Sequence, residues 1–328
     1  MAGTKTTKQT GGGSELRAAA DVARRYYLRG ESKVEIAADL GLSRFKVARL
    51  LDLANEAGLV RIEIVEPVEE RLVELADPLK ERWGLVECHV VPDSETALDD
   101  VARVAGDLLG RMLSPSDVLG LPWSRFVHAM VNTLSSLPQV PIVQLNGALA
   151  SSPVDSSPVD IVRRASRISR GGRQVFFAPL VMPDAEAAEA VRRDPAVRDT
   201  LAAASTVTVA VVGVGTWAPG GSTIYDAVDD TSRREAEAAG VVGEIAGVFF
   251  DEEGRVVHPP LTDVMITLSA EQLVQIPTVL AGCYLVEVVP GLLSALRGGL
   301  VNALVVTAAI AERLLGAEAG VESGQRTR

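Results

Sequence analysis

The sequence has few of the residues that most often build disulfide frameworks and metal centres. Its 328 residues include two cysteines and three histidines. Two cysteines far apart in the chain form no disulfide framework. Cys88 and His89 are adjacent in a strand-like stretch, so their side chains point to opposite faces and cannot hold a metal ion together. No histidine has a metal-ligand spacing to Cys, Asp or Glu, and we expect a structural role for each.

Catalytic and membrane-insertion patterns are also missing. No P-loop, GxSxG or HExxH pattern occurs. The run Gly213–Gly215 follows an apolar stretch, but it lacks the third glycine of a dinucleotide fingerprint. No apolar run is long enough to span a bilayer, and the N-terminus has no apolar signal-peptide core. We therefore expect no catalytic residues, no cofactor, no metal and no membrane contact, and a cytoplasmic location.

Basic charge is scarce overall but concentrated at one end of the sequence. The chain has 32 Lys and Arg against 43 Asp and Glu, a net charge of −11. Residues 1–62 nevertheless carry 11 basic and 7 acidic side chains, whereas residues 63–328 carry 21 and 36. A basic head on an acidic body confines the attraction for nucleic-acid phosphates to the head.

The segment Lys33–Gly58 predicts two short helices joined by a tight turn. Ile36 and Leu40 lie on one face of the first helix, and Gly41 suits the left-handed position after its end. Ser43 is a favourable N-cap for the second helix. The second helix has an apolar face made of Val47, Leu50, Leu51 and Ala54. An ordinary helical hairpin has the same amphipathicity, but basic residues directly after the N-cap favour a helix-turn-helix that reads DNA.

The recognition helix defines the expected contacts to double-stranded operator DNA. The expected DNA-facing residues are Lys33, Ser43, Arg44, Phe45, Lys46 and Arg49. Cationic side chains bind phosphates, and the first turn of the helix reads base edges. Phe45 is less usual there, and it either contacts a thymine methyl or packs on the first helix. A helix over residues 15–29 completes a three-helix core, and the alternating residues 59–67 predict a short strand or wing.

The length of the chain suits two domains, one of roughly 60 residues and one of roughly 250. Pro67 marks the boundary between them. We expect a disordered tail over 1–14, the helix-turn-helix domain over 15–65 and a linker or oligomerisation helix over 66–82. The larger domain then occupies 83–316, and a second disordered tail occupies 317–328.

Beyond Trp83 apolar strands alternate with helical segments. The strand-like stretches are VECHVVP, DVLGLPW, VPIVQLNGA, RQVFFAPL, TVTVAVVGVG, IAGVFF and ALVVT. Strands that are apolar throughout and alternate with helices predict a parallel sheet covered on both faces, a doubly wound α/β fold. Ligands of such sheets bind beyond the carboxyl ends of the strands.

Small residues follow several of these strands and are candidates for a ligand pocket. The stretches are GLPWS (120–124), NGA (146–148), GVG (213–215) and GGS (220–222). Glycine lets backbone N–H groups approach an oxygen-rich ligand, although each such glycine more often simply makes a turn. The carboxylates Asp226, Asp229, Asp230, Glu244, Asp251 and Asp263 are scattered, and we expect such loop charges to be solvated.

From about Ala18 to Leu315 the chain resembles SorC/DeoR-type bacterial transcriptional regulators. The resemblance is carried by IAADLGLSRFKVARLLDLANEAGLV, SDVLGLPWS, VPIVQLNGAL, DIVRRAS, VVGVGTW, VGEIAGVFFDEEG and LSALRGGLVNALVVT. It implies a homo-oligomer, a tetramer, that pairs a helix-turn-helix head with a phosphosugar-isomerase-like domain. Operator binding, typically repression, would respond to a sugar, polyol or sugar phosphate. The implied effector-binding residues are Gly120, Trp123, Ser124, Arg125, Asn146, Gly147, Gly213, Gly215 and Glu244.

The chain departs from the family pattern at residues that usually hold a phosphate. The usual Gly-Trp-Gly-x-Thr loop reads GLPWSRF here, so that Phe126 replaces the threonine and adds bulk. Val288 stands where a lysine is usual, and Ala308 stands where an acidic residue is usual. Arg125 is a replacement anion contact. We therefore expect an effector other than an ordinary sugar monophosphate, such as a neutral sugar, a polyol or another metabolite.

Two alternatives remain open from the sequence. The first is a phosphosugar isomerase-type enzyme with an accessory DNA-binding head, which requires a general base beside the strand-end loops. The second is a DNA-binding protein that has lost its ligand and uses its α/β body only to oligomerise. A cleft filled by side chains would favour this second alternative.

Overall fold

The computed structural model describes residues 11–60, 70–149 and 157–317, and the chain divides into two units after Pro67. The first unit, the head, consists of α1 (Gly11–Ala23), the π-helical turn η1 (Arg24–Leu28), α2 (Lys33–Leu40) and α3 (Arg44–Glu56). Helix α1 begins before Glu15, so the expected tail is wrong over residues 11–14, which are helical. Most of the expected strand or wing lies outside the described residues.

The head has a small apolar core of its own. Its buried side chains come from all three helices: Ala19, Val22, Ala23, Ile36, Ala37, Val47, Leu50, Leu51 and Ala54. Gly41 ends α2 with a φ of 64°, a left-handed conformation that costs glycine little. Arg25 fixes the first two helices because its Nε donates to Glu31 Oε2 at 2.8 Å and its Nη1 to Asp39 Oδ2 at 2.7 Å.

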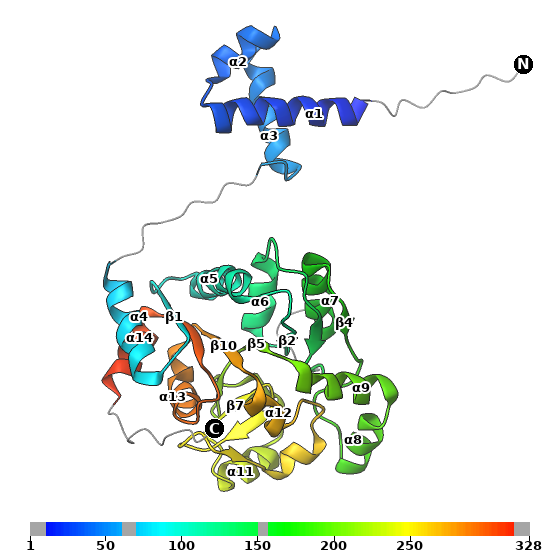
Figure 1. Ribbon diagram of the computed structural model, residues 1–328, viewed down its shortest axis with the longest axis vertical. Coiled ribbons are helices and arrows are strands. Elements are labelled where there is room, and N and C mark those ends of the chain that lie inside the picture. The colour runs from blue at the N-terminus through cyan, green and yellow to red at the C-terminus, as the bar shows by residue number, and fades with distance from the viewer. Residues whose placement is uncertain (1–10, 61–69, 150–156, 318–328) are drawn as a thin grey trace, which may run out of the picture. The chain divides into compact units, whose positions relative to one another are not determined.

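A seven-stranded parallel sheet forms the centre of the second unit, the body (Figure 1). Its strand order is β1-β11-β10-β5-β2-β3-β4. The strands are β1 (Glu87–Val91), β2 (Leu119–Leu121), β3 (Ile142–Gln144), β4 (Arg173–Gln174), β5 (Val209–Val212), β10 (Thr278–Cys283) and β11 (Ala303–Thr307). From β2 the chain proceeds to one edge through β3 and β4, and from β5 it proceeds toward the other edge. The order therefore reverses between β2 and β5.

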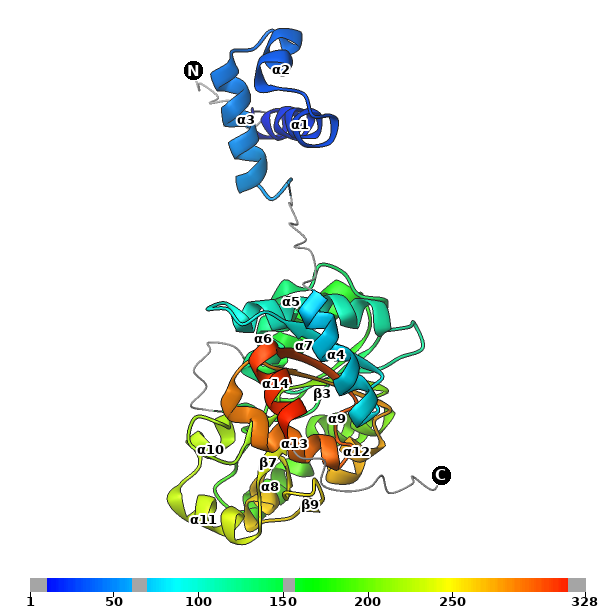
Figure 2. The same cartoon turned by 90° about the vertical axis from the view of Figure 1, so that its left-hand side faces the viewer.

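Helices cover both faces of this sheet (Figures 1 and 2). On one face lie α5 (Ala97–Met112), α6 (Arg125–Thr133) and α7 (Pro158–Ser169), and on the other lie α4 (Glu70–Trp83), α13 (Val289–Arg297) and α14 (Ala308–Gly316). Strand β5 shows the division, since Val209 and Val211 join the first apolar layer while Ala210 and Val212 join the second. The expected doubly wound α/β architecture is confirmed.

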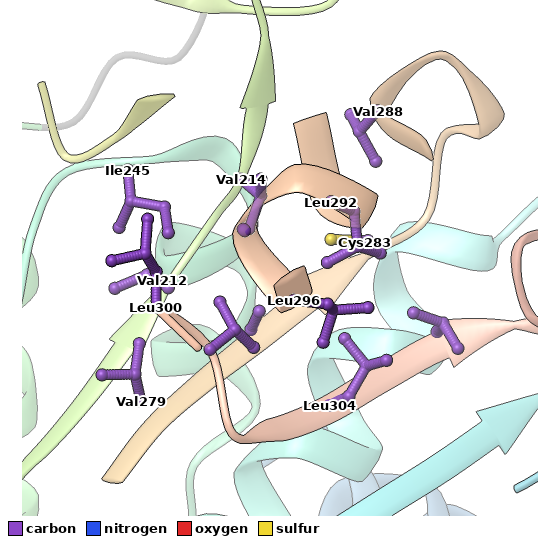
Figure 3. Packing of buried hydrophobic residues seen from close by; sticks show 14 of the residues in the cluster. Val212, Val214, Ile245, Val279, Cys283, Val288, Leu292, Leu296, Leu300 and Leu304 are labelled. Carbon is purple, nitrogen blue, oxygen red and sulfur yellow. The ribbon is translucent and has the colours of Figure 1, made fainter. Parts of the chain in front are cut away.

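The layer under α13 packs side chains from four segments of the chain. Figure 3 shows Leu292 and Leu296 of α13 among Val212 of β5, Val279 of β10 and Leu304 of β11. Burying a leucine of this kind contributes about 1.5–3 kcal/mol. The same layer includes Ile310 and Leu314 of α14 and Leu72 and Leu79 of α4.

Helix α4 is part of the body and is not a free linker. Leu79 is fully buried, and the helix packs on β1 and α14. Arg82 secures this contact because its Nη1 donates to the carbonyl oxygen of Leu315 at 2.8 Å. No helix among the described residues has the length and apolar character that a membrane span requires.

A second, antiparallel sheet was not expected from the sequence. It consists of β6 (Gly215–Thr216), β7 (Gly243–Ile245), β8 (Val248–Phe250) and β9 (Val256–Val257). The stretch IAGVFF, expected as one strand, is a hairpin because Ala246 and Gly247 have φ values of 55° and 91° and reverse the chain. The stretch RQVFFAPL contributes only β4.

Short helices complete the body: α8 (Ala185–Arg192), α9 (Pro195–Ala203), α10 (Thr223–Ala227), α11 (Asp230–Ala238), α12 (Ala270–Gln275) and η2, η3 and η4 (Ala204–Thr206, Pro260–Val264, Val286–Val288).

Gly282 on β10 provides a test of this packing. A Cβ there would overlap the ring of Phe126, whose side chain is buried. We expect Gly282→Ala to lower the free energy of unfolding by about 1–3 kcal/mol, because an overpacked core has to shift. Gly172→Ala is the control, since its Cβ would meet open space. The tryptophans lie at 83, 123 and 217, so their fluorescence during denaturation reports the body alone. Equal stability of both variants would contradict the packing.

Candidate DNA-binding surface and effector pocket

The start of α3 is held in place by its N-cap and carries a cationic surface. Ser43 Oγ accepts a hydrogen bond from the Lys46 backbone N–H at 3.2 Å. Arg44 and Arg49 are exposed, and the Phe45 ring is 84% exposed and does not pack on the first helix. Side chains at these positions of a helix are free to contact another molecule, whereas the opposite face is used by the apolar core of the head.

Two of the expected DNA-facing lysines have partners inside the head. Lys46 Nζ lies 2.6 Å from Glu15 Oε1 of α1, and this hydrogen bond lowers the pKa of the Glu15 carboxyl. Lys33 Nζ lies 5.6 Å from the centre of the Tyr26 ring. Exposed ion pairs of this kind are weak because solvent screens them, so Lys46 remains available to a DNA phosphate.

A pocket opens in the body at the point where the strand order reverses. Its walls include residues 122–126 after β2, residues 213–215 after β5 and residues 282–285 at the end of β10. The space inside it, including the open mouth, is about 750 Å³. Neighbouring strands whose connections leave in opposite directions create a crevice at their carboxyl ends, where ligands of doubly wound sheets bind.

Most of the residues expected to bind an effector line this one pocket. They are Trp123, Ser124, Arg125, Asn146, Gly213, Gly215 and Glu244. Tyr284, Leu285 and Ser222 also line it, although none of them was among the expected effector-binding residues. No local sequence pattern marks Tyr284 as a pocket residue, because a tyrosine can follow an apolar strand in proteins without a binding site there.

Gly120 and Gly147 were expected in the pocket, and this expectation is wrong. A Cβ at Gly120 would lie 2.8 Å from a Val207 methyl and 2.9 Å from a Leu145 methyl, in the apolar core. A Cβ at Gly147 would lie 2.5 Å from the carbonyl oxygen of Pro179. Both glycines are required by close packing of the chain and not by a ligand.

The three residues that depart from the family pattern, Phe126, Val288 and Ala308, occupy different environments in the fold. Val288 lines the pocket with an apolar side chain, as expected. The Phe126 ring is only 2% exposed and packs beneath Gly282, so the expected extra bulk inside the pocket is largely absent. Ala308 begins α14 and does not contribute to the pocket wall.

Glu244 on β7 provides a buried carboxylate in the pocket wall. Its side chain is 8% exposed, so the expectation that this charge is simply solvated is wrong. Ser222 Oγ donates to Oε1 at 2.9 Å, and the Gly247 N–H donates to Oε2 at 3.1 Å. Burial raises the pKa of Glu244, and the two hydrogen bonds oppose that shift. No cationic side chain among the described residues forms an ion pair with it.

The opposite side of the pocket is fixed by Asn146 and by the start of α6. Asn146 Oδ1 accepts from the Trp123 N–H at 2.7 Å, and Ser124 Oγ accepts from the Val127 N–H at 3.0 Å. Arg125 is partly exposed. Burial raises the pKa of the Tyr284 phenol, and the positive charge of Arg125, which also lines the pocket, opposes that shift.

Because the Glu244 carboxyl is buried, we expect the stability difference between Glu244→Gln and the parent to depend on pH. Its folded-state pKa is raised above the ordinary value of 4.5, so its stabilising contribution is complete at low pH and is lost as pH rises through the folded pKa. We expect Glu244→Gln to gain stability relative to the parent as the pH increases from 5 to 8. Thermal unfolding over this range measures it. Glu235→Gln, an exposed position on α11, is the control and should show no trend. A flat difference for Glu244→Gln would contradict the burial of this charge.

Comparison with known proteins places the body in a defined family. A family model described as "Putative sugar-binding domain" matches residues 68–316. An uncharacterized transcriptional regulator of Escherichia coli, YjhU, is 29% identical over 310 residues, which cover 89% of this chain and 92% of the relative. The deoxyribonucleoside regulator of Bacillus subtilis is 25% identical over 259 residues, 77% of this chain and 82% of the relative.

Solved structures show the same architecture. The full-length sorbitol operon regulator SorC of Klebsiella pneumoniae has a TM-score of 0.74 at 24% identity, over 92% of this chain and 98% of that one. A domain of a possible sugar-binding transcriptional regulator of Arthrobacter aurescens has a TM-score of 0.67 at 26% identity, over 76% of this chain and all of that one. The resemblance that the sequence motifs indicated is thereby confirmed, and the chain belongs to the SorC-type family that carries this sugar-binding domain.

Proposed function

We propose that the protein is a transcriptional regulator whose head binds operator DNA under the control of a small molecule in the body pocket. The observation that supports this most strongly is the N-terminal half of α3, where Arg44, Phe45 and Arg49 are exposed on a helix whose other face is apolar and buried. The names of the relatives, which are transcriptional regulators, support the same function.

In the proposed mechanism, affinity and specificity come from different groups. Lys46 and the exposed arginines neutralise phosphates, and this supplies most of the binding free energy. Base edges and methyl groups in the major groove are read by the first turn of α3. The protein acts as a homo-oligomer, a tetramer, so that two heads contact two half-sites. An effector that prefers one arrangement of the heads shifts the population toward it and changes operator affinity.

The open pocket favours a body that binds a regulatory ligand, rather than a body that only forms oligomers. The pocket combines apolar surface from Trp123, Leu180 and Ile224 with a few polar side chains, which is the composition of small-molecule sites. The isomerase alternative requires a general base, and Glu244 is one carboxylate with a raised pKa in the pocket. We favour regulation, because the relatives are named as transcriptional regulators.

Removing two cations from α3 tests the DNA-binding role. We expect Arg44→Ala with Lys46→Ala to weaken binding to a selected operator duplex by about 1–3 kcal/mol for each lost contact. The dependence of affinity on salt should also become shallower by about one unit of log–log slope per lost phosphate contact. Fluorescence anisotropy titrations at several salt concentrations measure both quantities.

A charge-matched variant of the body controls for the change in net charge. Arg193→Ala with Arg198→Ala removes two exposed arginines, one directly after α8 and one within α9. It should leave the affinity and the salt slope almost unchanged. Equal loss of binding in both double variants would mean that α3 is not the DNA-contacting element.

Phe45 tests base reading separately from phosphate binding. Because its ring is 84% exposed, it is available to contact a thymine methyl in the major groove. We expect Phe45→Ala to lower the preference for thymine over other bases at one operator position, with little change in the salt slope. Competition assays with single-base operator variants measure this preference. Retention of the full preference at every operator position would exclude a base-reading role for Phe45.

A further inference from the structure

We propose that the effector carries a protonated amino group that binds Glu244, and that it carries no phosphate. This inference rests on the proposed function, because it assigns a ligand chemistry to the same pocket. It is drawn from the arrangement of charge in the pocket wall, where a buried carboxylate has hydrogen-bond donors but no compensating cation.

The hydrogen bonds of Glu244 leave it with acceptor capacity. Each carboxylate oxygen has two lone-pair positions, and Ser222 and Gly247 each use one, on different oxygens. Gly215 allows this approach, since a Cβ there would lie 2.5 Å from Glu244 Oε1. The carboxylate is therefore held in a fixed position in the pocket wall, and one lone-pair position on each oxygen is not used by Ser222 or Gly247.

The energetics favour a cationic donor. A buried ionised carboxylate is costly when it is unpaired, and two neutral donors offset only part of that cost. A ligand ammonium supplies the missing opposite charge and makes a charge-assisted hydrogen bond, which is stronger than the bond from a neutral hydroxyl. Binding of an amine thus offsets a cost that the empty pocket carries.

The same wall disfavours a phosphate. The pocket is lined by Val288 rather than by a basic residue at this point, and Arg125 is its one cation among the described residues. Ser124 Oγ already accepts one of the first N–H groups of α6. A phosphate dianion would be attracted by Arg125 alone and repelled by Glu244, so the net electrostatic gain is small.

The remaining walls indicate a compact ligand body. Trp123, Leu180 and Ile224 offer apolar surface, and Asn146 and Tyr284 offer polar atoms for hydroxyl groups. An amino sugar or a small cyclic amine fits this combination of apolar walls and few polar groups.

Matched sets of probes test the ligand chemistry on the full chain. Thermal unfolding is followed with glucosamine, glucose and glucose 6-phosphate, and with cyclohexylamine and cyclohexanol. A ligand that binds only the folded state raises the melting temperature saturably. We expect an amine in at least one set to raise it more than its hydroxyl and phosphate counterparts. A larger rise with the phosphate, or no rise with any amine, would overturn the proposal.

The Glu244→Gln variant tests whether the carboxylate is responsible for the rise in melting temperature with an amine. We expect the variant to bind the stabilising amine roughly thirtyfold more weakly or worse, because the opposite charge is gone. Glu235→Gln is the matched control and should bind the amine as the parent does. An amine response that survives in a folded Glu244→Gln protein would overturn the proposal.

The pH dependence gives a third readout. As the pH rises through the raised pKa of Glu244, the affinity for the amine should rise in the parent and stay flat in Glu244→Gln. Burial raises the pKa of the Cys283 thiol to about 12 and also raises the pKa of the Tyr284 phenol, so neither of these two groups of the described wall loses its proton in the same range. Operator binding by Glu244→Gln is measured in parallel. Intact operator binding with no amine preference in the parent would contradict the ligand class and leave the regulator function standing.

Discussion

The reversal of strand order between β2 and β5 is the constraint on which the body depends. The connections after these two strands leave toward opposite edges of the sheet, which opens a crevice at their carboxyl ends. The segments that follow, residues 122–126 and 213–215, form the walls of the pocket. Short residues at Gly213 and Gly215 then allow Ser124 and Glu244 to approach closely, so the site follows from the topology as well as from its side chains.

The antiparallel sheet adds what the parallel sheet cannot supply. Strand β7 delivers Glu244 to the pocket, and the tight turn into β8 brings the Gly247 N–H to its second oxygen. Ser222 completes the arrangement because it caps α10 and also donates to Glu244. A charged group is thus built into a largely apolar wall, at a cost that a suitable ligand offsets.

Local sequence signals predicted the structure correctly where a residue strongly prefers one backbone conformation or one position in a helix. Gly41 and Ser43 predicted the turn and cap of the head, because left-handed backbone and an N-cap oxygen are strong requirements. Strands apolar throughout predicted the covered parallel sheet. The hairpin at Ala246 was missed because a non-glycine residue at positive φ is uncommon. The packing roles of Gly120 and Gly147 and the burial of Phe126 depend on distant segments, which no local pattern reports.

In the proposed function, the head attracts and binds DNA and the body selects the small-molecule ligand. Basic residues are concentrated in the sequence of the head, and acidic residues in that of the body, so DNA phosphates attract the first and not the second. The function proposed for the head requires sequence-specific DNA binding by α3. This binding is tested by selection from a random duplex library with the full chain, in parallel with the Arg44→Ala, Lys46→Ala variant. We expect one recurrent motif with paired half-sites for the parent and none for the variant. Equal enrichment by both proteins, or no enrichment by the parent, would contradict it.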